Sequence, residues 1–236
     1  MKKLFAVVLA VLCLAACKKD DTILYQYTAF GDVSGTNLIA DNGVTFHITK
    51  LSGTDGYNAN ERVLFVCNIL KKVSDSEYNI ELLDWNRVVR KAYVKSSEVT
   101  DDAALGNAPV YLTNAWISGE YLNLAVALTF VRDSETKHIV NLVLDEASSD
   151  DNTLCFTLRH NSNGESVGGG SALTFDDVVI GRAYYSFPIK NLIPLGGSKE
   201  IKISWEWHIT DDKGNFLPET ETRTTTGTAA SNYKLD

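Results

Sequence analysis

A serine framed by glycines is the group whose spacing most directly suggests catalysis. Residues 164–168 match the G-x-S-x-G pattern of a nucleophile elbow, and Asp176 or Asp177 and then His208 follow in the Ser, Asp, His order of α/β-hydrolases. That elbow needs a sharp strand-to-helix turn to expose the serine and to aim backbone N–H groups at the oxyanion. Here two further glycines lead into another strand-like stretch, and no helix follows. We therefore predict that Ser166 is a loop residue and that the protein is not an enzyme.

The histidines show no spacing typical of metal ligands. They stand singly in the sequence, at His47, His138, His160 and His208, with no H-x-x-x-H or C-x-x-C arrangement. His138 and His160 fall in neighbouring predicted strands and could meet across a sheet. Histidines that satisfy backbone groups or fill a sheet face are commoner than ligands. The sequence therefore predicts neither a metal nor a cofactor.

The densest polar cluster is Arg159-His160-Asn161. Guanidinium forks and imidazole tips recognise carboxylates and sugars, so this cluster could line a binding groove. Alternatively, Arg159 and His160 could pin neighbouring loops, and we favour that structural interpretation.

Two aromatic residues, Tyr57 and Trp85, fall in predicted loop or turn segments. Exposed rings at such positions would suit stacking on a sugar. Rings in turns also fold back onto their own domain, and the sequence leaves both outcomes open.

The N-terminus carries an export signal with a reactive thiol at its end. Lys2 and Lys3 precede an uncharged apolar run over residues 4–16, which at 1.5 Å per residue reaches about 20 Å. A bilayer core of about 30 Å needs a longer helix, so the run is typical of a signal peptide. Leu14-Ala15-Ala16-Cys17 matches the lipoprotein-processing box, in which the Cys17 thiol takes up a diacylglyceryl group. The less favoured alternative is a general secretory signal that leaves Cys17 as a free thiol.

The residues after Cys17 suggest an address. Position 18 is Lys rather than Asp, which resembles lipoproteins sent to the outer membrane. Lys19-Asp20-Asp21 is similar to a short acidic signal that places lipoproteins on the cell surface, but a solvated charge run explains it equally well. We expect an outer-membrane, lipid-anchored protein, with surface display open.

Charge and cysteine usage narrow the class of partner. The formal net charge is −8, and loss of the two signal-peptide lysines takes it to −10, so nucleic acid is a disfavoured partner. Only Cys67 and Cys155 remain as thiols in an acylated mature chain. Cys67 shares a strand face with Phe65 and Ile69, whereas Cys155 lies opposite the apolar face of its own strand, so we expect two free thiols.

Period-2 alternation of apolar and polar residues dominates and predicts an all-β protein. In the first half an Asn42-Gly43 turn suggests a hairpin. Predicted strands lie at 29–33, 36–40, 44–49, 63–70, 78–83 and 88–94, the last two joined by a turn at Asp84-Trp85-Asn86. A set of about this many short strands in under 80 residues is the size of a small OB-like five-stranded barrel.

The second half has longer strands. Alternation is clear at 122–130 and 201–209, with further candidates at 138–144, 154–160, 172–175 and 184–189, which together fit a β-sandwich. Within 201–209, Trp205 and Trp207 are expected in the core. The predicted organisation is a signal peptide (1–16), an acylated N-terminus and tether (17–27), an OB-like barrel (28–95), a linker (96–106) and a sandwich (107–236) that folds alone.

Four short stretches carry a family resemblance. They are Arg62-Val63-Leu64, Tyr121-Leu122-Asn123-Leu124, His138-Ile139-Val140-Asn141-Leu142 and Leu158-Arg159-His160-Asn161. With the lipoprotein start and the two β domains, the mature chain resembles the NigD-like family of outer-membrane lipoproteins. The resemblance implies an OB-like N-terminal domain and an all-β C-terminal domain, and it brings no enzymatic site.

The expected function is therefore non-enzymatic. We expect a lipid-anchored protein that binds an unidentified protein or glycan partner. The alternatives are a glycan-binding surface module, a bacteriocin-associated or immunity lipoprotein suggested by the family name, and, least favoured, a serine hydrolase. Candidate binding residues are Tyr57, Trp85, Arg159, His160 and Asn161, and Cys17 is the candidate lipidation site.

Overall fold

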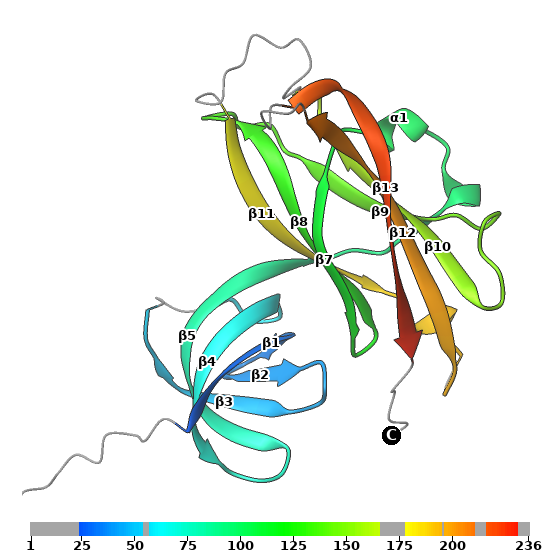
Figure 1. The fold of residues 1–236 in the computed structure, drawn as a ribbon. Coiled ribbons are helices and arrows are strands. Elements are labelled where there is room, and N and C mark those ends of the chain that lie inside the picture. The colour runs from blue at the N-terminus through cyan, green and yellow to red at the C-terminus, as the bar shows by residue number, and fades with distance from the viewer. Residues whose placement is uncertain (1–23, 54–56, 166–177, 195, 211–215, 231–236) are drawn as a thin grey trace, which may run out of the picture.

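A computed structural model describes residues 24–53, 57–165, 178–194, 196–210 and 216–230, and within these ranges the chain is almost entirely strand (Figure 1). The all-β class predicted from alternation is confirmed. No helix in the described ranges is long and apolar enough to cross a membrane. The signal peptide, Cys17, Ser166 and the predicted strand at 172–175 lie outside the described residues.

The first half forms a closed five-stranded barrel. Its strands are β1 (Tyr25–Ser34), β2 (Asn37–Ala40), β3 (Thr45–Leu51), β4 (Arg62–Lys72) and β5 (Glu77–Arg90). They pair in the ring β1-β2-β3-β5-β4, which closes because β3 pairs with β5 in parallel as well as with β2. The expected OB-like barrel is therefore present. Its core includes Phe46, Phe65 and the thiol of Cys67, which faces inward as its strand parity predicted.

The predicted turn at Asp84-Trp85-Asn86 is wrong. β5 runs unbroken through these residues, with Trp85 opposite Phe65 on β4. A register shift between β4 and β5 falls just before the predicted turn. Val66 pairs with Asp84 and Cys67 with Leu82, which leaves Leu83 as an extra residue on β5 and interrupts the alternation of that strand. Such β-bulges locally disrupt the ladder and bend the strand without ending it, whereas in the sequence the broken pattern resembles a turn.

The second half is a sandwich of two sheets. The remaining strands are β6 (Val94–Lys95), β7 (Tyr111–Ser118), β8 (Tyr121–Val131), β9 (Ile139–Leu144), β10 (Thr153–Asn161), β11 (Val178–Pro188), β12 (Ser198–Thr210) and β13 (Phe216–Ala230). One sheet has the order β13-β12-β10-β9-β6, and the other adds β11, β8 and β7 to the barrel strands. Their facing sides enclose one core that contains Phe156, Phe187 and Trp205, with Trp207 partly buried against it.

The barrel and the sandwich share a sheet. The end of β5 leaves the barrel and pairs in parallel with β11, Val88 opposite Tyr184, so that one eight-stranded sheet runs from β3 to β7 (Figure 1). This continuity fixes the direction in which the sandwich leaves the barrel.

The predicted linker is also part of the sandwich. Val94–Lys95 pairs with β9, and residues 96–106 contain the short helices η1 (Ser96–Glu98) and α1 (Asp102–Leu105), the second of which contacts β9 and β10. The sandwich therefore begins before residue 107. The polar composition that suggested a linker reflects a segment held by side-chain hydrogen bonds rather than by apolar burial.

Two strands were not predicted at all. Both lie at sheet edges, where one side of a strand has no partner strand. β7 mixes polar and apolar residues across a register shift near Thr113, and the described part of β13 is mostly exposed threonine and glutamate. An edge strand that buries little apolar surface leaves no alternation to detect.

Candidate functional site

A buried arginine lies where the two domains meet. Arg62, at the start of β4, has a side chain only 1% exposed, and its two terminal nitrogens donate to the two carboxylate oxygens of Asp41 at 2.7 Å each. Its Nε donates to the hydroxyl of Ser186 on β11 at 2.7 Å, and a terminal nitrogen donates to Asn123 on β8 at 3.2 Å. We call Arg62, Asp41, Ser118, Asn123 and Ser186 the interdomain joint.

The polar groups of the joint also bond to one another. Ser118, at the end of β7, donates to Asp41, and the Asn123 amide donates to Ser118 at 2.8 Å. The guanidinium carbon of Arg62 lies 4.0 Å from the centre of the Tyr121 ring, a favourable cation–π distance. Removing one partner of such a buried pair leaves an uncompensated charge, so each member holds the others in place. The joint therefore holds the barrel and the sandwich in one fixed relation.

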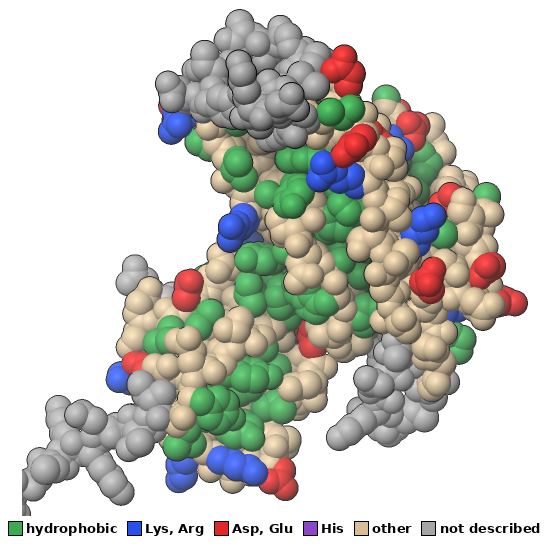
Figure 2. Space-filling view, in the orientation of Figure 1, with side chains coloured by type: hydrophobic (Ala, Val, Ile, Leu, Met, Phe, Trp, Pro, Cys, Tyr) green, Lys and Arg blue, Asp and Glu red, His purple; other side chains and the backbone are tan. Residues whose placement is uncertain are grey.

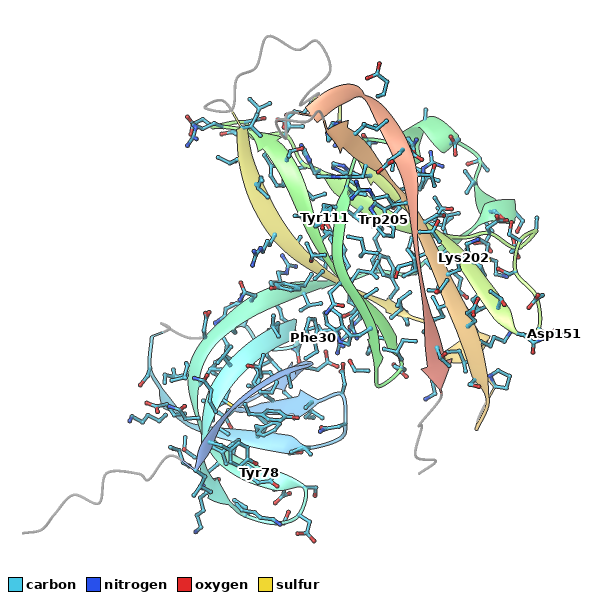
Figure 3. The ribbon with its side chains drawn as sticks, in the orientation of Figure 1. Phe30, Tyr78, Tyr111, Asp151, Lys202 and Trp205 are labelled. Carbon is cyan, nitrogen blue, oxygen red and sulfur yellow. The ribbon has the colours of Figure 1, made fainter. Side chains whose placement is uncertain are left out.

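A cleft of about 320 Å³ opens beside this joint, and we call it the interdomain cleft. Hydrophobic side chains gather over the region where the two domains meet (Figure 2), and Phe30 lies at that junction (Figure 3). The rings of Phe30 and Trp116 meet edge to face, with centroids 4.9 Å apart. The cleft is lined by Tyr27, Thr28, Ala29, Phe30, Ala40, Asp41, Asn42, Leu64, Trp116 and Ser118.

Arg159 and Asn161, two of the predicted binding residues, hold the preceding segment in place. Arg159 donates to both carboxylate oxygens of Asp102, at 2.9 and 3.1 Å, and to the Gly106 carbonyl at 2.6 Å. Hydrogen bonding and charge from Arg159 lower the pKa of the Asp102 carboxyl. Asn161 donates to the Ala104 carbonyl at 2.9 Å.

Gly106 passes close to β10 with a φ of +67°, and an added Cβ would lie 2.5 Å from the His160 carbonyl oxygen. Only glycine fits there. We call Arg159, His160 and Asn161, with the segment 101–109 that they hold, the clamp, and its geometry matches the favoured structural interpretation.

His160 belongs to a buried chain of polar contacts. Its Nδ1 donates to the Pro109 carbonyl at 2.9 Å, and its Nε2 lies 3.0 Å from Nδ1 of His138, so the two histidines meet across neighbouring strands. Burial lowers the pKa of His160, which favours a neutral ring whose Nε2 accepts from His138. His138 in turn faces the Glu165 carboxylate at 3.0 Å.

Glu165 is held in its ionised form. Burial raises the pKa of its carboxyl, but hydrogen bonds from the Ser134 hydroxyl, the Val131 N–H and His138 outweigh that effect and bring the pKa to about 2. A carboxylate behind two imidazoles resembles part of a catalytic relay, yet this chain ends on a backbone carbonyl instead of a nucleophile. In the described part of the chain, no three His, Cys, Asp or Glu side chains gather as metal ligands would.

Tyr57 and Trp85 are both half-buried and pack against the barrel core. Their placement matches rings that fold back onto their own domain. His208 alternates with Trp205 and Trp207 as expected but is itself only 5% exposed, and Ser166 lies outside the described residues.

Sequence reasoning missed the joint, although its members left a trace. Arg62 is a charged residue at the start of an apolar strand, and Asn123 interrupts an otherwise apolar run. Both belong to stretches that carry the family resemblance. A buried charge requires a partner, but the spacing along the chain could not show that Arg62 meets Ser186, 124 residues away.

Comparisons with known proteins agree with this architecture. The model of the NigD-like C-terminal beta sandwich domain matches residues 92–215. Among solved structures, a protein of unknown function from Bacteroides vulgatus is 22% identical with a TM-score of 0.60, over 86% of this chain and 91% of that one. A NigD-like immunity protein from Bacteroides caccae is 18% identical with a TM-score of 0.57, over 82% and 90%.

A candidate lipoprotein from Bacteroides fragilis is 15% identical with a TM-score of 0.57, over 86% of this chain and 97% of that one. At these identities the similarity shows a shared fold. No curated protein matches the sequence.

Proposed function

The chain belongs to the NigD-like family, and from that premise we propose that it is a lipid-anchored envelope protein that binds a partner without catalysing a reaction. The observation that carries the proposal is the interdomain joint. A binding surface built from two domains is effective when the orientation of the domains is fixed before binding. No conformational entropy is then lost in ordering them when the partner binds. The Arg62–Asp41 pair supplies that rigidity directly beside the interdomain cleft.

The composition of the cleft supports binding rather than chemistry. Tyr27, Phe30 and Trp116 offer apolar ring surface, and Asn42 offers an amide at the rim. The Asp41 carboxylate is already occupied by Arg62 and Ser118. Rigid aromatic anchors with a few neutral polar groups are typical of protein-binding surfaces.

The cellular location of the protein is also part of the proposal. The processing box ending at Cys17 supports acylation, and the structural relative from Bacteroides fragilis described as a candidate lipoprotein agrees with it. The outer membrane is the proposed location, with the domains facing either side of it. Replacing Cys17 by Ser should move the protein from the membrane fraction to soluble or unprocessed forms. A mutant that stays acylated and membrane-bound would contradict the anchor.

Crosslinking in intact cells tests the binding proposal. A photoreactive residue at Asn42, on the cleft rim, should crosslink to a specific partner that mass spectrometry identifies. A matched control at Val73, an exposed position on the barrel that does not line the cleft, should give no such product. Equal crosslinking at the two positions, or none at Asn42, would contradict a cleft-directed partner.

A glycan is the second candidate partner. The cleft combines the rings of Tyr27 and Trp116 with the side chains of Asn42 and Thr28, a combination that suits stacking on a sugar and hydrogen bonding to its hydroxyls. Tyr57 and Trp85 are the candidates for sugar stacking in the sequence, and the structure suggests Tyr27 and Trp116 in this cleft instead. A glycan array tests this alternative. Binding that is lost in Trp116→Ala and kept in Trp85→Ala would show that the partner is a sugar and not a protein.

A toxin is the partner class suggested by one relative. The similar protein from Bacteroides caccae is described as an immunity protein, and immunity implies a bound toxin. If the partner crosslinked at Asn42 is a secreted toxin, cells that lack the protein should become sensitive to it.

The absence of catalysis has its own test. Incubating the purified protein with a broad fluorophosphonate probe should label Ser166 no more than a heat-denatured control. Stoichiometric labelling that Ser166→Ala and His208→Ala both abolish would make the protein a hydrolase.

A further inference from the structure

The two sheets of the sandwich part along one side, between β7 and the β12–β13 pair. At one end they are joined by a hydrogen bond from the Val110 N–H to the Glu206 carbonyl, at 3.0 Å. Beyond it a groove of about 260 Å³ opens between β7 residues 112–117 and β13 residues 225–228, with Ile203 and Trp205 among the residues that line it. We call this space the seam groove. It is lined by different strands from the interdomain cleft, apart from the shared strand β7.

Trp205, which lines the groove, carries a buried polar group that has no partner among the described residues. Trp205 is only 7% exposed and lies between the two sheets (Figure 3), and its indole Nε1 is buried without a hydrogen-bond partner among the described residues. A buried indole N–H normally finds an acceptor, because leaving it unpaired costs about 1–3 kcal/mol. An acceptor that an occupant of the groove brought against the edge of this ring would satisfy the donor.

Among the described residues, both rims of the groove are strand edges without a further partner strand. β7 is the last strand of the eight-stranded sheet and β13 is the last strand of the five-stranded sheet. Backbone N–H and C=O groups along such edges are available to pair with another strand.

These edges lack their usual protection where they flank the groove. Sheet edges are commonly blunted by charged residues and proline. β7 contains neither. β13 carries Pro218, Glu219, Glu221 and Arg223 in its first half, but residues 225–228, which line the groove, are uncharged and free of proline.

We propose that an extended, uncharged peptide segment of a partner protein pairs with the free edge of β7 and inserts its inward-facing side chains into the seam groove. One of these side chains carries an amide carbonyl or a hydroxyl, which accepts a hydrogen bond from Trp205. This inference rests on the proposed binding function and names one class of partner for it. The mode of recognition is β-strand addition, in which main-chain hydrogen bonds give affinity and alternate side chains give specificity.

The size and charge of the groove favour this occupant. A volume of about 260 Å³ is below the range of about 300–1,000 Å³ typical of small-molecule pockets, but it suits side chains that enter from a strand lying along the edge. Six residues of β7 border the groove, which at 3.4 Å per residue gives an edge of about 20 Å. The lining residues are all uncharged, so a charged side chain entering from a partner would lose its hydration without gaining a counter-ion.

Selection from a phage-displayed library of random linear nonapeptides against the full chain in detergent tests the proposal. Enriched peptides should be uncharged, and a synthetic copy should bind in fluorescence anisotropy. Asn114→Lys places a charge on the exposed groove edge of β7 and should weaken binding at least tenfold. Thr224→Lys adds the same charge at an exposed position of β13 outside the groove lining, and it should leave the affinity unchanged.

The indole N–H resonance of Trp205 reports on binding separately from the overall stability of the fold. Binding should shift the indole ¹⁵N–H resonance of Trp205 in the manner of a newly formed hydrogen bond. Trp205→Phe should weaken the peptide about threefold to tenfold and remove that resonance.

Three outcomes would overturn the inference. Peptides that bind Asn114→Lys as tightly as the unchanged protein would place the site elsewhere. Failure of any peptide to enrich over a surface coated with Asn114→Lys would show that the groove takes no strand. A dimer of the protein that Asn114→Lys dissociates would make the occupant a second copy of this chain. If Asn42 still crosslinks a partner in cells while no peptide binds, only this inference fails and the proposed function stands.

Discussion

The interdomain joint and the clamp both include residues from stretches that carry the family resemblance, yet they differ in reach and in chemistry. The joint uses one guanidinium to connect two domains. The clamp lies within the sandwich and extends through His160 and His138 to Glu165, so titratable groups contribute to it. Charged and polar side chains therefore hold the fold in both regions, one set between the two domains and the other inside the sandwich.

The largest expected effect comes from breaking the joint. Arg62→Met leaves the Asp41 carboxylate buried without its counter-ion, which should lower the free energy of unfolding by about 3–5 kcal/mol. Urea denaturation measures the loss. The double variant Arg62→Met, Asp41→Leu should recover much of it, because no uncompensated charge then remains. A single variant within 1 kcal/mol of the unchanged protein would show that the joint is dispensable.

The clamp should be most sensitive at Gly106. Gly106→Ala forces a side chain into positive φ and against the His160 carbonyl oxygen, and should cost about 2–3 kcal/mol. Gly35→Ala is the matched control, because Gly35 has a φ of +60° with no atom within 4 Å of an added Cβ. Thermal melts of the two variants separate backbone strain from close approach. Equal losses would mean that the contact with β10 has no energetic weight.

The two regions should also differ in their response to acid. The Glu165 pKa of about 2 lies below its ordinary value of 4.5, so the unfolded chain binds more protons than the folded one between these values. The stabilisation by Glu165 is therefore present above pH 4.5 and is lost as the pH falls toward 2. Urea titrations at pH 6, 4 and 3 should show the unchanged protein converging on Glu165→Gln. A constant difference across this range would disprove the assignment.

The smallest effect is expected at the exposed side of the clamp. Arg159→Ala removes the hydrogen bond to the Gly106 carbonyl, about 1 kcal/mol, while water already screens the exposed Asp102. The melting temperature should fall by about 2–4 °C. A loss as large as that of Arg62→Met would put the clamp on a par with the joint.

The strands that could be predicted are those that bury one face. β8 and β12 alternate cleanly because one side of each lies in the sandwich core. The turn wrongly placed at Trp85 came from a broken pattern, which the extra residue Leu83 on β5 explains. β7 and β13 bury too little apolar surface to alternate.

The sites were harder to predict than the fold. The clamp residues Arg159, His160 and Asn161 stood out because they are adjacent in the sequence. Arg62 and Ser186 stood out only once tertiary pairing had brought them together, since no local pattern connects residues so far apart.

The sheet shared through β5 has a consequence for the order of folding. All five barrel strands are complete by Arg90, so the barrel can close from contacts within one short stretch of chain. The pairing that joins the end of β5 to the sandwich, Val88 with Tyr184, connects residues 96 positions apart, and such distant pairings form slowly. Until β11 pairs with it, the end of β5 is a strand edge whose backbone groups are open to pairing with strands of other molecules. That end carries three positively charged residues, Arg87, Arg90 and Lys91. Their charges would disfavour aggregation through this edge while the remainder of the chain is still unfolded.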